Sequence, residues 1–119
     1  MASQERRKAV RAPARLAMQI QLSGQDAARV ETINVSANGV YFTTSSYIPT
    51  LTKLGVTLVL PGEGDSGVRE VTVEGIVVRT EPEQADPATA SYDVACYFTG
   101  ISDTDREHLE SYILKQLAF

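Results

Sequence analysis

The 119-residue chain has no tryptophan, a single cysteine and a single histidine. One cysteine excludes an intramolecular disulfide and any zinc site built from several cysteines. His108 lies among polar residues near the chain end, so a solvated position is favoured over a catalytic one. No run of about 18 apolar residues occurs, so no membrane insertion is expected. Gln19 and Gln21 interrupt the apolar stretch that follows the basic N-terminus, which argues against a signal peptide and favours a cytoplasmic protein.

Positive charge is scarce beyond the first fifteen residues. Residues 1–15 contain five basic side chains and one acidic, whereas residues 16–119 contain six basic and fourteen acidic, and the net charge is −4. An acidic body repels nucleic acid, so DNA is not an expected partner. A small anion held by the basic segment remains possible. The length and the ordinary globular composition predict one domain over residues 13–119, preceded by a basic segment over residues 1–12.

Alternating hydrophobicity predicts an all-β body. Residues 16–22 alternate apolar and polar side chains, as half-buried strands do. Turn residues separate further apolar runs, and Pro49 argues against a central strand over residues 47–55. The other predicted strands cover residues 28–36, 39–44, 56–61, 68–80 and 91–100, with a bulge or bend at Gly75. Six short strands joined by short turns favour a closed antiparallel barrel.

The chain ends in a different pattern, which predicts a helix over residues 103–118. Leu109, Ile113 and Leu117 recur every four residues and form one apolar face. Ser102 and Asp105 resemble a capping box, with Asp in place of the usual Glu. We expect this helix to cover one opening of the barrel or to pack against its outside.

Catalytic and cofactor signatures are missing from the sequence. The Gly-rich run at residues 62–67 lacks the Lys-Ser/Thr pair of a phosphate-binding P-loop, and the carboxylates are scattered along the chain. These features predict a protein that is not an enzyme and that holds neither a cofactor nor a metal. A small barrel enzyme or flavin binder is the remote alternative, and a colourless sample without turnover would exclude it.

Two short motifs stand out. Residues 7–11 read Arg-x-x-x-Arg and residues 34–39 read Asn-x-Ser-x-x-Gly. Each alone fits a basic tail or a hairpin turn, but in this order and separation they resemble the PilZ domain family of cyclic di-GMP receptors. The segments "VEGIVVRT" (73–80) and "YDVACYFTGIS" (92–102) extend the resemblance over most of the chain, with Ala95 where the family usually has glycine. The resemblance implies a six-stranded antiparallel barrel with a closing C-terminal helix.

The residue types of these motifs suit the ligand that the resemblance implies. Arginine matches the O6 and N7 acceptors of guanine with a bidentate fork and also pairs with phosphate. The Asn34 carbonyl can accept a hydrogen bond from guanine, and the Ser36 hydroxyl can donate one to phosphate or base. Gly39 allows close backbone approach and positive φ. The resemblance therefore implies a binding set of Arg7, Arg11, Asn34, Ser36 and Gly39.

Two further arginines extend this set. Arg79 lies where some PilZ domains stack a side chain on guanine, and a plain solvent-facing position is an equal alternative. Arg6 directly precedes the first motif, which in the family accompanies an intercalated pair of ligand molecules. The favoured function is a receptor, monomeric or weakly dimeric, in which ligand orders the N-terminal segment and alters contacts with an unidentified protein partner. The alternative is a PilZ-type adaptor that binds protein partners and no nucleotide.

Overall fold

The computed structural model describes residues 11–62 and 67–117, which fold into one antiparallel sheet and one helix. The helix α2 spans Asp103–Leu117. The strands are β1 (Ala12–Pro13), β2 (Ala17–Gln21), β3 (Ala28–Val35), β4 (Gly39–Thr44), β5 (Lys53–Pro61), β6 (Val68–Glu81) and β7 (Tyr92–Ile101). The predicted all-β architecture with a C-terminal helix is confirmed.

The sheet closes into a barrel because β3 pairs with strands on both of its edges. The order β3-β2-β5-β6-β7-β4 returns to β3 through the β3–β4 pairing, which gives the six-stranded barrel. The two-residue strand β1 was not predicted. It lies on the β3 edge where Ala12 pairs with Val35 and Pro13 pairs with Asn34. Proline is tolerated at such a short edge because its missing N–H removes little from the ladder.

Strand β5 begins three residues earlier than the sequence predicts, at Lys53 instead of residue 56. Its first residues pair with Ile76, Gly75 and Glu74 of the long strand β6. The predicted bulge is confirmed, since the β6–β7 register shifts between Glu74 and Gly75. A second shift follows between Val77 and Arg79.

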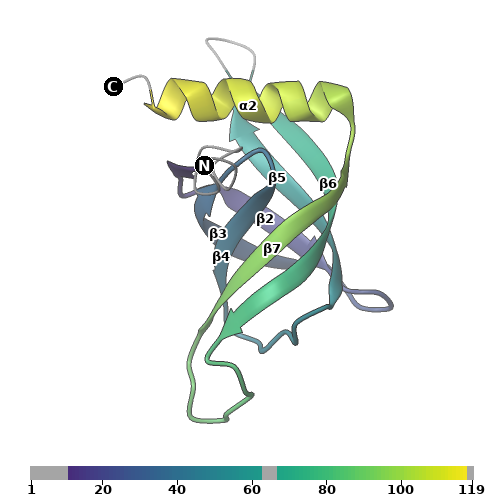
Figure 1. The fold of residues 1–119 in the computed structure, drawn as a ribbon, viewed down its shortest axis with the longest axis vertical. Coiled ribbons are helices and arrows are strands. Elements are labelled where there is room, and N and C mark those ends of the chain that lie inside the picture. The colour runs from purple at the N-terminus through teal and green to yellow at the C-terminus, as the bar shows by residue number, and fades with distance from the viewer. Residues whose placement is uncertain (1–10, 63–66, 118–119) are drawn as a thin grey trace, which may run out of the picture.

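The core fills the barrel, and α2 lies across one of its ends (Figure 1). Leu109 and Ile113 of α2 are buried, whereas Leu117, which was predicted to share that face, is exposed because it lies at the helix end. Ser102 caps the helix as predicted, since its Oγ accepts from the Asp105 N–H at 3.1 Å. The Asp105 carboxylate instead accepts from the Thr72 N–H of β6 at 3.2 Å, which fastens the helix to the barrel.

Within the described ranges, no helix is both long and apolar enough to cross a membrane. The predicted helix end at residue 118 lies outside the described residues.

Candidate nucleotide-binding site

The two sequence motifs meet on the outer surface of the barrel. Arg11 directly precedes β1, and β1 pairs with the end of β3 that carries Asn34. This pairing brings together residues 23 positions apart, and Arg11 Nη1 donates to Asn34 Oδ1 at 2.7 Å. The Asn34 side chain points outward because its neighbour Val35 fills the core. The unpredicted strand β1 is therefore what places the first motif against the second.

Ser36 organises the turn between β3 and β4. Its side chain is only 2% exposed, and its Oγ accepts from the N–H groups of Asn38 at 3.1 Å and Gly39 at 3.2 Å. The Ser36 N–H donates to the Gly39 carbonyl at 2.9 Å. These hydrogen bonds satisfy the hydroxyl inside the turn, in the manner of a Ser turn. A direct contact of Ser36 with ligand stays a prediction.

Gly39 is required by close packing of backbone against backbone. A Cβ at this position would lie 2.5 Å from the Cys96 carbonyl oxygen of β7. The expected close approach is thus present, but the expectation of positive φ is wrong, because only Gly24 and Gly67 among the described glycines have positive φ. The Asn38 carbonyl accepts from the Phe98 N–H at 2.8 Å, which holds the turn against β7.

A row of outward side chains extends from Asn34 across the barrel. Asn34 pairs with Tyr41 of β4, Tyr41 pairs with Ala95 of β7, and Ala95 pairs with Arg79 of β6. Three strand spacings of about 4.8 Å separate the first from the last, so Arg79 lies roughly 14 Å from Asn34. Arg79 is exposed on the same surface as Asn34, and its Nε lies 4.0 Å from Glu81. A contact of Arg79 with ligand stays a prediction.

Some predicted site residues cannot be placed. Arg6 and Arg7 lie outside the described residues, so only Arg11 represents the basic segment here. Conversely, sequence reasoning did not single out Tyr41, although it follows the second motif by two residues and β-strand alternation turns it outward.

The helix contacts the same turn. Arg106 Nη1 of α2 donates to the Ala37 carbonyl at 3.2 Å. Because Ala37 lies between Ser36 and Asn38, this hydrogen bond joins the site to the element that covers the barrel end. Sequence spacing gives no signal for it, since the two residues are 69 positions apart.

Two side chains near the core, Cys96 and His108, can be compared with the sequence interpretation. Burial raises the pKa of the Cys96 thiol to about 12, as suits the predicted packing role. His108 is half-buried and not solvated as expected, and its Nδ1 has no hydrogen-bond partner among the described residues. No group of three or more metal-ligating side chains occurs in the part of the chain that the structure describes.

Comparison with known proteins places this arrangement in a family. The PilZ domain model matches residues 5–115. No curated protein sequence matches the chain. Among solved structures, *Bacillus subtilis* MotI/DgrA, an inhibitor of motility, superposes with a TM-score of 0.79 at 24% identity, over 95% of this chain and 51% of that one.

Two similar structures contain cyclic di-GMP. The PilZ domain of *Escherichia coli* YcgR has a TM-score of 0.63 at 16% identity and covers 95% of this chain and 92% of that one. The *K. pneumonia* MrkH–cyclic di-GMP complex has a TM-score of 0.68 at 16% identity and covers 94% of this chain and 52% of that one. The chain thus spans about half the length of MotI/DgrA and MrkH. At these sequence identities, the similarity to solved structures shows the fold alone. The match of the PilZ domain model over residues 5–115 shows that the chain belongs to the PilZ domain family, a family of cyclic di-GMP receptors.

Proposed function

We propose that this PilZ domain binds cyclic di-GMP, without turning it over, on the outer face of the barrel where β1 meets β3. The observation that carries the proposal is the 2.7 Å hydrogen bond between Arg11 and Asn34. It brings one residue from each motif to a single point on the surface, next to a turn that Ser36 and Gly39 hold in place.

The hydrogen-bonding state of this pair suits guanine. Since the Asn34 carbonyl already accepts from Arg11, the side chain offers its amide N–H groups, and Arg11 retains further guanidinium donors. Guanine O6 and N7 are adjacent acceptors on one edge, and phosphate oxygens are acceptors too. The site is therefore richer in donors than the sequence interpretation of Asn34 as an acceptor from guanine assumed.

The charge of the surroundings supports a defined orientation of the ligand. A second row of outward side chains lies next to the row that begins at Asn34, on the side away from α2. It comprises Glu31, Thr43, Asp93 and Glu81. Its three carboxylates outnumber the two arginines that pair with them, Arg15 with Glu31 and Arg79 with Glu81, so the row is weakly negative and less favourable for an anion. The two phosphates are expected to lie toward the basic segment instead, where Arg6 and Arg7 precede Arg11 in the sequence.

Isothermal titration calorimetry of the purified chain with cyclic di-GMP, and with GTP as a control, tests the proposal. We expect saturable binding that is selective over GTP. Arg7→Ala and Arg11→Ala should each weaken binding by roughly tenfold or more, because each removes charge-assisted hydrogen bonds. Arg15→Ala is the matched control, since Arg15 is 82% exposed and makes a surface ion pair with Glu31 at 3.7 Å.

The receptor proposal is contradicted if Arg7→Ala and Arg11→Ala both bind cyclic di-GMP with normal affinity. It is also contradicted if the unmodified chain does not bind cyclic di-GMP. The second result would favour the adaptor that binds protein partners alone. The titration also gives the stoichiometry, and two ligands per chain would support a role for Arg6 in holding an intercalated pair.

The proposed output is an altered protein–protein contact that follows ordering of residues 1–12, in a cytoplasmic protein that is monomeric or weakly dimeric. The acidic balance of residues 16–119 favours a protein partner over DNA.

A further inference from the structure

On the outer face of the barrel, Tyr41 and Tyr97 differ from Tyr47 and Tyr92 in the hydrogen bonds that their hydroxyl groups make. Tyr47 and Tyr92 pack edge to face at 5.4 Å and place their hydroxyls on backbone groups of the loop that follows β6. Tyr41 and Tyr97 have no hydrogen bond from their hydroxyls to any described residue. Tyr97 is 52% exposed, an unusual position for a large aromatic side chain on a central strand.

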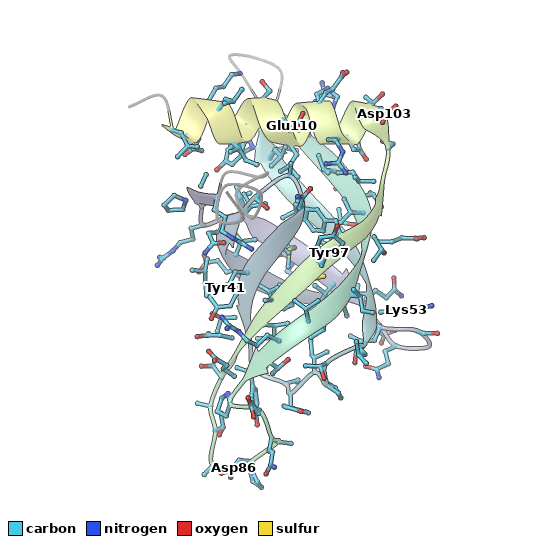
Figure 2. All side chains as sticks on the ribbon, viewed as in Figure 1. Tyr41, Lys53, Asp86, Tyr97, Asp103 and Glu110 are labelled. Atoms are coloured by element: carbon cyan, nitrogen blue, oxygen red, sulfur yellow. The ribbon has the colours of Figure 1, made fainter. Side chains whose placement is uncertain are left out.

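These two tyrosines lie beside the proposed ligand contacts. Tyr41 is the direct cross-strand partner of Asn34, and Tyr97 is two residues along β7 from Ala95, the partner of Tyr41 (Figure 2). Both side chains face outward because their neighbours Val40, Phe42, Cys96 and Phe98 are buried. Tyr41 and Tyr97 therefore belong to the same surface as the Arg11–Asn34 pair.

Each tyrosine lies opposite a small residue. In the β4–β7 register, Tyr41 pairs with Ala95 and Gly39 pairs with Tyr97. A side chain at position 39 is excluded by the Cys96 carbonyl, so that flank of Tyr97 stays bare. The tyrosines are diagonal neighbours, for which Cα positions lie about 7–8 Å apart. A single base that lies against this surface can therefore contact both rings.

We propose that Tyr41 and Tyr97 form a stacking platform for a purine base of the ligand, a proposal that rests on the function proposed above. Bases stack on aromatic side chains irrespective of charge. The row of Glu31, Asp93 and Glu81 lies on the opposite side of Tyr41 from Tyr97. Because this row stays weakly negative after its ion pairs with Arg15 and Arg79, an anionic ligand is favoured on the Tyr97 side. On the α2 side, the surface beyond Tyr41 consists of Gly39, Tyr97 and Ile76, which suits the face of a base.

Calorimetric titration of cyclic di-GMP into Tyr97→Leu, Tyr41→Leu and Tyr97→Phe tests the platform. Leucine keeps an apolar side chain but removes the ring, and we expect each leucine variant to weaken binding by about fivefold or more. Tyr97→Phe is the matched control, because it keeps the ring and loses a hydroxyl that has no partner in the described ranges. Its affinity should stay within about twofold of the unmodified chain.

Salt dependence separates stacking from a change in the charged contacts. The loss in the leucine variants should be the same at low and at high salt, whereas Arg11→Ala should reduce the slope of affinity against salt. Unaltered thermal unfolding midpoints establish that the variants fold.

The outcomes distinguish the two proposals. If Arg11→Ala loses binding while both leucine variants bind as tightly as the unmodified chain, the platform is wrong and the receptor stands. If Tyr97→Phe loses as much affinity for cyclic di-GMP as Tyr97→Leu does, the stacking platform is also contradicted. If the unmodified chain does not bind cyclic di-GMP, the receptor proposal fails first and the platform loses its ligand with it.

Discussion

Substitution of Gly39 by alanine is the sharpest test of how the site is built. The added Cβ would lie 2.5 Å from the Cys96 carbonyl oxygen and 3.5 Å from the Tyr97 Cα, and both contacts are with backbone that cannot rotate away. Strands β4 and β7 must separate to admit it. Overpacking of this kind costs about 1–3 kcal/mol. Weakening of the Phe98 N–H bond to the Asn38 carbonyl adds about 1 kcal/mol.

These costs convert into a thermal shift that calorimetry resolves. Unfolding entropies of roughly 2.1 cal/mol/K per residue give about 250 cal/mol/K for this chain, so each 1 kcal/mol lowers the midpoint by about 4 °C. A loss of about 2–4 kcal/mol therefore lowers it by roughly 8–16 °C. Ligand affinity should fall too, because the Ser36–Gly39 turn must move.

Gly55→Ala is the matched control, since it makes the same chemical change within a strand of the same barrel. There the added Cβ would meet only the Gln21 carbonyl oxygen, at an ordinary 3.8 Å. Alanine also restricts the unfolded chain more than glycine, so this variant should be neutral or up to about 1 kcal/mol more stable. The reasoning is refuted if Gly39→Ala melts within about 2 °C of the unmodified chain, or if Gly55→Ala loses as much.

Two further predictions concern buried polar groups. Thr32 Oγ1 donates to the Ala14 carbonyl at 2.5 Å and accepts from the Leu16 N–H at 2.8 Å, so Thr32→Val should cost about 2–3 kcal/mol in urea unfolding; a loss below about 0.5 kcal/mol would contradict it. Burial raises the pKa of Cys96 from 9.0 to about 12, so between these values the unfolded chain releases the thiol proton and the folded chain keeps it. Stability should therefore fall as pH rises from about 9 towards 12, and a thiol reagent at about pH 8 should modify native protein far more slowly than urea-unfolded protein; equal rates would show that Cys96 is accessible.

The barrel was predictable because its strands follow a simple alternation. Met18 and Ile20 face inward between exposed residues, and period 2 places such a strand without knowledge of its partners. The start of β5 was not predictable in this way. Lys53 to Gly55 are strand residues only because β6 is long enough to pair with them, and that is a property of the partner.

The site was predictable in its residue types but not in its connections. Spacing identified both motifs, yet it could not show that Ala12 and Pro13 would pair with β3 and thereby bring Arg11 to Asn34. For a similar reason, the prediction for Gly39 was correct about close backbone approach and wrong about positive φ. Glycine in a turn usually suggests positive φ, but here the need comes from the Cys96 carbonyl on a strand more than fifty residues away.

The turn between β3 and β4 connects the proposed ligand contacts to the rest of the fold. It holds β7 through the Asn38 carbonyl, and it holds α2 through the Ala37 carbonyl, which accepts from Arg106 at 3.2 Å. A ligand shifts a conformational equilibrium only by binding its two states with different affinity. Under the proposed function, rearrangement of the Arg11–Asn34 pair on binding would supply such a difference next to this turn. The helix α2 also carries the exposed Leu114. A partner that contacts the outer face of α2 would therefore respond directly to a change in the position of the helix on the barrel.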